Sequence, residues 1–153
     1  MYRIDRASDA DFADAWRIVN EYFDAIALPP AGRDDRDVLR AYLPEPNGLW
    51  LARGGDATVG LIALRRLDAI PGACEVKRLF VQPAHRGARL ADALLDALEA
   101  SAERSGYTVA YLDTRADLVA ALAFYRRRGY EPCERYSDNP EATNFMRRRL
   151  GTR

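Results

Sequence analysis

Residues that bind metals or form disulfides are scarce in this 153-residue sequence, which contains two cysteines and a single histidine. Cys74 and Cys133 do not have the spacing of metal ligands, and no secretory feature favours a disulfide. A Ser-His-Asp or Cys-His triad would have to use His85, which lies in a basic turn beside an arginine. We therefore expect two reduced core cysteines, no metal site and no nucleophilic hydrolase.

Net charge and long apolar segments are also missing. Lysine and arginine together number 23, and so do aspartate and glutamate, so no overall field favours nucleic acid or an anionic membrane as a partner. The N-terminus, Met1–Asp5, carries no long apolar run that would indicate a signal peptide or a membrane span. These absences predict a cytoplasmic protein with neither partner, and the length suits one domain over residues 1–153.

Periodic apolar residues and turn signals predict an alternation of strands and helices. The segment Ser8–Asp11 is typical of the cap that precedes a helix. Strands are expected at residues 2–5, 49–53, 58–66, 74–81, 107–113, 130–136 and 143–150, and further helices at 34–42, 89–104 and 117–128. An antiparallel start followed by a strand–helix–strand crossover predicts an α+β fold, with a mixed, largely antiparallel sheet of about seven strands flanked by about four helices.

The most informative segment is a strand, a basic turn and a helix in direct succession. The apolar strand Leu79–Val81 stops before Pro83, a turn containing Arg86 and Gly87 follows, and the helix expected at 89–104 begins at once. The first turn of a helix leaves backbone N–H groups free and carries the positive end of the helix dipole. This arrangement is typical of a site for phosphate groups.

Three blocks in this order resemble the GCN5-related N-acetyltransferase (GNAT) superfamily. Its acetyl-CoA motif, Arg/Gln-x-x-Gly-x-Gly/Ala, is matched by Arg86–Ala91, which reads Arg-Gly-Ala-Arg-Leu-Ala. The preceding strand Cys74–Val81 and the following helix end Ala121–Tyr130 are also similar to the family. Order and spacing agree across roughly residues 57–135. The resemblance implies a GNAT-like sheet with the strand–turn–helix at its centre.

The resemblance also implies a function. It predicts an acetyl-CoA-dependent enzyme that moves an acetyl group to a primary amine of a small molecule by direct attack, without a metal. Acetylation of protein N-termini or lysines and a non-catalytic acyl-CoA sensor are the alternatives, and a homodimer is compatible with each. The implied cofactor-binding residues are Leu79, Phe80, Val81, Arg86, Gly87, Ala88, Arg89, Leu90, Ala91, Ala121, Phe124 and Tyr125.

Two positions depart from the family pattern. Arg89 stands where the motif has its first glycine, a residue used where φ is positive or a ligand comes close. If position 89 is already helical, arginine is tolerable and its charge can reach a phosphate; if φ must be positive, CoA binding is weakened. Leu118 stands where the family often has an asparagine that contacts the pantetheine arm, so that contact is lost.

Three side chains are candidate catalytic groups. Glu75 and Asp113 match the positions of catalytic glutamates in histone-acetylating and ribosomal-protein-acetylating members, so the resemblance implies that one of them removes the amine proton, directly or through water. Tyr125 matches the tyrosine that protonates the departing thiolate. Structural alternatives stay open: Glu75 in an ion pair with Lys77 or Arg78, Asp113 capping a turn, and Tyr125 packed as an amphipathic core residue.

Strand 74–81 should be central and mostly apolar, yet it carries three charged residues. Simple alternation places Glu75, Lys77, Leu79 and Val81 on one face and Val76, Arg78 and Phe80 on the other. Charges on both faces of a central strand break the local pattern in the way that functional sites often do.

Overall fold

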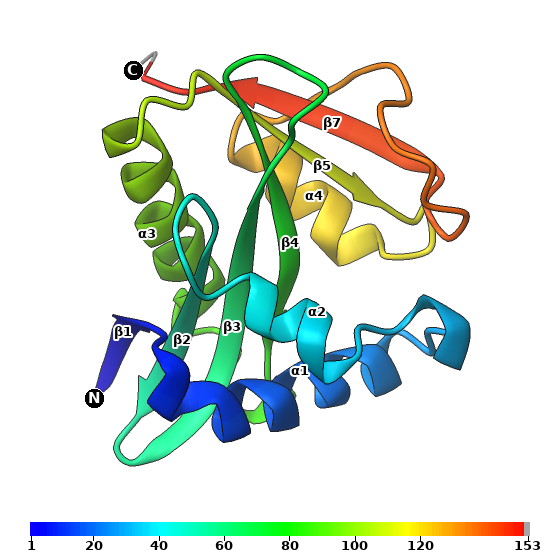
Figure 1. Cartoon of the computed structure of the whole chain (residues 1–153). Coiled ribbons are helices and arrows are strands. Elements are labelled where there is room, and N and C mark those ends of the chain that lie inside the picture. Colours follow the sequence, from blue (N-terminus) through cyan, green and yellow to red (C-terminus); the bar gives the residue numbers. More distant parts are fainter. Residues whose placement is uncertain (152–153) are drawn as a thin grey trace.

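The computed structural model describes residues 1–151, which form a seven-stranded sheet with four α-helices (Figure 1). The strand order is β1-β2-β3-β4-β5-β7-β6, and every pair is antiparallel except the parallel pair β4–β5. The elements are β1 (Tyr2–Arg6), α1 (Phe12–Ala25), α2 (Arg36–Ala41), β2 (Gly48–Gly54), β3 (Ala57–Arg66), β4 (Ala73–Val81), α3 (Leu90–Arg104), β5 (Val109–Thr114), α4 (Val119–Arg127), β6 (Glu131–Pro132) and β7 (Asn144–Arg149). The predicted α+β class and the mixed, largely antiparallel sheet are confirmed.

Helices cover both faces of the sheet, and each face has its own apolar core. Helices α3 and α4 pack on one face through residues such as Leu94, Leu98 and Leu122. Helices α1 and α2 pack on the other through Ile18, Phe23 and Leu39. Burying both faces explains why the central strands read as nearly continuous apolar runs, and it makes polar side chains in β4 conspicuous.

The helix ends follow local sequence chemistry. Ser8 and Asp11 form a reciprocal capping box one turn before α1, as the sequence predicts. Helix α3 ends at Arg104 with Ser105 as its C-cap, and the next residue, Gly106, has a φ of +89° that glycine adopts without steric cost. The strand expected at 130–136 is wrong beyond Pro132, because the chain leaves the sheet edge and forms a loop that reaches back over β4 and β5. Cys133 in this loop is half-buried, so only Cys74 is a core cysteine.

A β-bulge interrupts β4. Leu61 of β3 pairs with Phe80, and Ala63 pairs with Lys77, so three steps along β4 oppose two along β3. Arg78 lies in the bulge with a φ of +61°. The predicted alternation is therefore wrong beyond Lys77, because the extra residue reverses the faces of all later side chains.

The bulge sorts the β4 side chains by polarity. Val76, Leu79 and Val81 contact the core beneath α3 and α4, whereas Phe80 packs toward α1. The charged residues of β4 share the α1 face, since Arg78 donates two hydrogen bonds to Asp34 in the loop before α2. The charges expected on both faces are thus gathered on one.

The parallel pairing of β4 with β5 is short. It joins residues 73–75 to 109–111 and then stops, and the two strands separate toward their carboxyl ends (Figure 1). Ligands of open sheets with crossover helices bind at such a carboxyl edge.

We expect Gly60→Ala to destabilise the fold. A Cβ at Gly60 would lie 2.7 Å from the carbonyl oxygen of Phe80, so β3 and β4 would have to move apart beside the bulge. Urea unfolding should show a loss of about 1–3 kcal/mol, as for other overpacked sites. Gly32→Ala is the control, because its Cβ meets only ordinary contacts at 3.4 Å or more. Equal stability of the two variants would contradict the close approach of β3 and β4.

Candidate active site

A central cleft of about 620 Å³ opens where β4 and β5 separate. Residues 76–81 of β4 form one wall, Asp113 and Thr114 of β5 lie at one end, residues 118–125 form the opposite wall, and Tyr22 of α1 lies at its border. The sequence-predicted residues Leu79, Phe80, Val81, Arg86, Ala91, Asp113, Ala121, Phe124 and Tyr125 all line it. Segments distant in the sequence thus meet in one cavity.

A turn pocket of about 400 Å³ continues this cleft toward the start of α3. It shares Val81, Arg86, Ala91 and Phe124 with the central cleft. Its other lining residues include Gly87, Arg89 and Leu90. Within residues 1–151, the backbone N–H groups of residues 87–89 have no acceptor in the chain. Free donors next to a helix N-terminus fit an anionic group such as a phosphate.

The turn is shaped by two left-handed residues. Gly87 has a φ of +94°, which only glycine adopts at low cost. Arg89 has φ +58° and ψ +31°, and α3 begins at the next residue. Of the two alternatives for position 89, a helical arginine is wrong, because the backbone takes the conformation that the family's glycine would favour. The Arg89 side chain is exposed beside the turn pocket, where it can meet an anion.

Tyr125 lies on the wall of the central cleft. The residue is 7% exposed, and its ring contacts Phe124 and Tyr130. Within the described chain its hydroxyl has no hydrogen-bond partner. Burial raises the pKa of Tyr125 well above its ordinary value, so the phenol keeps its proton at neutral pH. A protonated hydroxyl without an internal partner can donate to a ligand in the cleft.

Glu75 does not line the cleft. Its side chain is fully buried, and its carboxylate accepts hydrogen bonds of 2.6 Å from Arg65 Nη2 and 2.6 Å from the Tyr136 hydroxyl. Tyr136 comes from the loop between β6 and β7, so no local pattern around Glu75 indicates this contact. The structural alternative of an ion pair with Lys77 is present at 3.7 Å, but Arg65 is the closer partner, and Glu75 is buried instead of lying at the surface.

Asp113 lies at the cleft, near the end of β5. Its side chain is 6% exposed, and it accepts hydrogen bonds from Ser137 Oγ (2.6 Å) and Asn139 Nδ2 (3.3 Å). The sequence alternative of a cap for the following turn does not match these partners. Asp113 is therefore the one of the two predicted carboxylates that borders the cavity.

An inner pocket of about 130 Å³ lies next to the central cleft on the α1 side. It shares Tyr22, Ile26, Lys77, Arg78, Asp113, Thr114 and Leu118 with that cleft. Its far wall comes from Asn139, Glu141 and Ala142 in the loop before β7. Tyr22 and the loop wall carry no local signal in the sequence, and the sequence predicts Lys77 only as an ion-pair partner.

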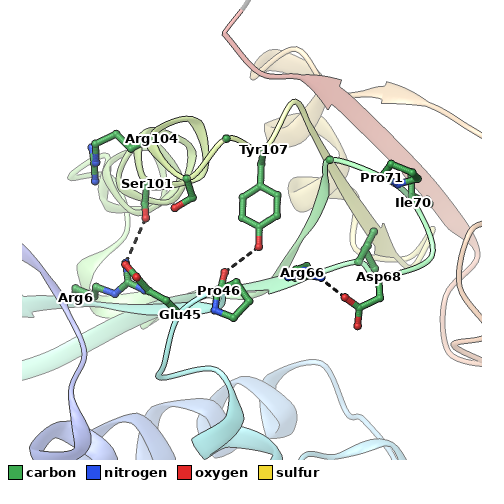
Figure 2. Close-up of a pocket in the computed structure, with 14 residues that line it drawn as sticks. Arg6, Glu45, Pro46, Arg66, Asp68, Ile70, Pro71, Ser101, Arg104 and Tyr107 are labelled. Carbon is green, nitrogen blue, oxygen red and sulfur yellow. Dashed lines mark hydrogen bonds and ion pairs between the residues drawn. The ribbon is translucent and has the colours of Figure 1, made fainter.

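A wider depression, the hairpin hollow, lies between the β3–β4 hairpin and the C-terminal end of α3 (Figure 2). Its volume is about 930 Å³, but it contains none of the predicted site residues. Its polar groups bond mainly to one another: Arg6 donates to Ser101, Tyr107 to Pro46, and Arg66 pairs with Asp68. The central cleft, though smaller, is where unpartnered donors converge.

Comparisons with known proteins agree with this geometry. A family model described as "Acetyltransferase (GNAT) family" matches residues 12–130. The chain is 33% identical over 136 residues to an N-acetyltransferase of Schizosaccharomyces pombe, covering 85% of the chain and 82% of the relative. It is also 35% identical over 80 residues to an "IAA acetyltransferase" of Azospirillum brasilense. This match covers 52% of the chain and 52% of that relative.

Solved structures show the same fold. A GNAT-family acetyltransferase of Staphylococcus aureus superposes with a TM-score of 0.86 at 20% identity, covering 98% of this chain and 99% of that one. The chain therefore belongs to the GNAT family of acetyltransferases. It is an acetyltransferase, and the family uses acetyl-CoA as the acetyl donor.

No helix in the described part of the chain has the length and apolar character needed to span a membrane. Within the same residues, no three side chains of the metal-binding types gather closely enough to hold an ion.

We expect Arg89→Gly to stabilise the protein. A left-handed conformation costs a non-glycine residue about 1–2 kcal/mol, which glycine avoids, while glycine's looser unfolded state offsets part of the gain. A rise in Tm of about 2–4 °C should result. Arg89→Ala removes the same charge but keeps the strain, so its Tm should not rise. Equal Tm values for the two variants would show that the backbone conformation at position 89 carries no cost.

Proposed function

We propose that residues 1–153 act as one cytoplasmic domain that transfers the acetyl group of acetyl-CoA to a primary amine of a small molecule by direct attack. The observation that carries this proposal is the continuity of three cavities. The turn pocket, the central cleft and the inner pocket share lining residues in succession. A phosphate site, a buried phenol and a carboxylate therefore border one connected space.

The donor would lie along the first two cavities. Its pyrophosphate would accept from the N–H groups of residues 87–89, near the positive charges of Arg86 and Arg89. The pantetheine arm would pass between residues 79–81 of β4 and the α4 residues Ala121 and Phe124. Beyond Glu75, β4 has no β5 partner, so backbone N–H groups on that edge are available to stabilise the oxyanion.

Tyr125 would serve as the general acid. When the amine nitrogen bonds to the acetyl carbon and the C–S bond breaks, the sulfur leaves as a thiolate. The raised pKa of Tyr125 guarantees that its proton is present, and proton transfer to the thiolate removes the developing charge.

Asp113 would accept the amine proton, directly or through one water. A free amine has a pKa near ~10, so it must lose a proton before its lone pair can attack. Asp113 borders both the central cleft and the inner pocket, whereas Glu75 is fully buried beneath Arg65 and Tyr136. Glu75 would then act as a positioning residue that holds the loop carrying Tyr136.

The small inner pocket favours a small-molecule acceptor. Asn139, Glu141 and Ala142 close its far side, which leaves about 130 Å³ for the group that carries the amine. An Escherichia coli ribosomal-protein-S18-alanine N-acetyltransferase shares the fold at a TM-score of 0.76, but its 16% identity says nothing about the acceptor. A protein acceptor stays the alternative, and thiol release with small amines separates the two.

Gly87→Pro should abolish acetyl-CoA binding. Proline has no N–H to donate and fixes φ near −65°, whereas Gly87 has a φ of +94°. Isothermal titration of the folded variant should show no binding, with circular dichroism as the check on folding. Gly55→Pro is the matched control, because Gly55 also has a positive φ but lies in the β2–β3 turn. Unchanged affinity in Gly87→Pro would refute the phosphate assignment.

Tyr125→Phe should lower kcat by about 10²–10⁴-fold while acetyl-CoA affinity stays within a few fold, since a general acid acts in the transition state. The ring remains, so the packing against Tyr130 is kept. Because Tyr125 stays protonated far above neutral pH, its loss should lower kcat evenly between about pH 6 and pH 9. A full kcat in an assay limited by chemistry would make Tyr125 a packing residue.

Asp113→Asn and Glu75→Gln should separate the two carboxylates. Asp113→Asn should lower kcat/KM at neutral pH, with a deficit that shrinks as pH rises and more amine is deprotonated in solution. Glu75→Gln should mainly lower Tm, because it weakens the buried contacts with Arg65 and Tyr136. The pH profile of kcat/KM and a thermal melt for each variant decide the assignment. The reverse pattern would make Glu75 the base.

A further inference from the structure

Lys77 is a buried cation that the proposed chemistry leaves unused. It is the last regular residue of β4 before the bulge, and it lines both the central cleft and the inner pocket. Its side chain is only 9% exposed. Its Nζ lies 3.7 Å from Glu75 Oε2 and 3.9 Å from Asp113 Oδ1, both beyond hydrogen-bond length. Within residues 1–151, Nζ donates no hydrogen bond.

The neighbouring carboxylates are already engaged by closer donors. Glu75 accepts hydrogen bonds from Arg65 and from the Tyr136 hydroxyl. Asp113 accepts hydrogen bonds from Ser137 and Asn139. Each carboxylate is thus held by donors that lie closer to it than Lys77 Nζ does. An ammonium group has three N–H donors, and leaving them unpaired in a buried place is costly.

The other cations at the inner pocket have partners of their own. Arg78 donates to both oxygens of Asp34, and Arg115 donates to both oxygens of Asp117. Lys77 is therefore the cation at this pocket that donates no hydrogen bond within the described chain, although it lies at ion-pair distance from Glu75 and Asp113. An anionic group on the acceptor would accept hydrogen bonds from its Nζ.

We propose, on the basis of the proposed function, that the acceptor is an α-amino acid whose carboxylate binds Lys77 Nζ while its amine faces Asp113. The 3.9 Å between Nζ and Asp113 Oδ1 suits a molecule in which one carbon separates carboxylate and amine. Ile26, Leu28, Leu118 and Ala142 add apolar surface to a lining that also includes Thr114, Arg115, Asn139 and Glu141, and an aliphatic or aromatic side chain would pack against these four residues. A plain amine would leave Lys77 Nζ without a hydrogen bond.

The experiment compares acceptors that differ only in the carboxylate. Thiol release from acetyl-CoA is measured with leucine against 3-methylbutylamine and with phenylalanine against 2-phenylethylamine, at several pH values so that amine basicity is accounted for. The wild type should favour each amino acid by at least about 10-fold in kcat/KM, because sites built to pair a polar group reject analogues that lack it. Lys77→Met should abolish the preference without changing acetyl-CoA affinity.

Arg65→Met is the matched control, because it removes a positive charge next to the same Glu75 but lines neither cavity. It should keep the preference for the amino acids. Equal or faster turnover of the plain amines by the wild type would overturn the carboxylate assignment and leave the proposed function standing. Binding of acetyl-CoA with no thiol release for any of the four acceptors would contradict the proposed function itself, and the carboxylate assignment with it. Neither outcome depends on the folding of Lys77→Met.

Discussion

The bulge at Arg78 and the early end of the β4–β5 pairing shape the cavity in which we propose that the chemistry occurs. A regular parallel sheet would close the space between β4 and β5 with backbone hydrogen bonds. Here the strands part after Glu75, so the backbone edge of β4 faces a cavity instead of a neighbouring strand. The bulge also turns Leu79 and Val81 toward α3 and α4, which gives the cavity an apolar wall and places the charged residues on the opposite face.

The charged residues of that opposite face are linked by ion pairs and hydrogen bonds into one network, and they are not separate surface pairs. Glu75 and Asp113 each hold the loop between β6 and β7, through Tyr136 and through Ser137. That loop supplies one wall of the inner pocket. The same contacts that satisfy two buried carboxylates therefore also shape the place where an acceptor would bind, so substitutions here are expected to couple stability to substrate choice.

Local signals in the sequence predicted much of this structure. The capping box at Ser8, the helix after Arg89 and the glycine at position 106 depend on residues within a few positions of each other, and each lies where the sequence indicated. The turn, Tyr125 and Asp113, which the family resemblance implies as site residues, line two adjoining cavities, and their roles stay predictions.

What the sequence did not show depends on contacts between distant segments. The bulge contains an arginine with positive φ, and no glycine marks it. Glu75 does not face the cleft, and its carboxylate accepts a hydrogen bond from Tyr136, which lies 61 residues later in the sequence. That Lys77 Nζ lies near two carboxylates without a hydrogen bond to either likewise follows only from the folded structure, and no spacing rule contains that information.

A crystal structure of the protein with bound CoA tests the central claim most directly. The account predicts pyrophosphate oxygens on the N–H groups of residues 87–89, the pantetheine arm in the central cleft, and the sulfur within about 4 Å of the Tyr125 hydroxyl, close enough for proton transfer with small adjustments. CoA bound in the hairpin hollow of Figure 2, or with its sulfur outside the space between β4 and β5, would contradict it.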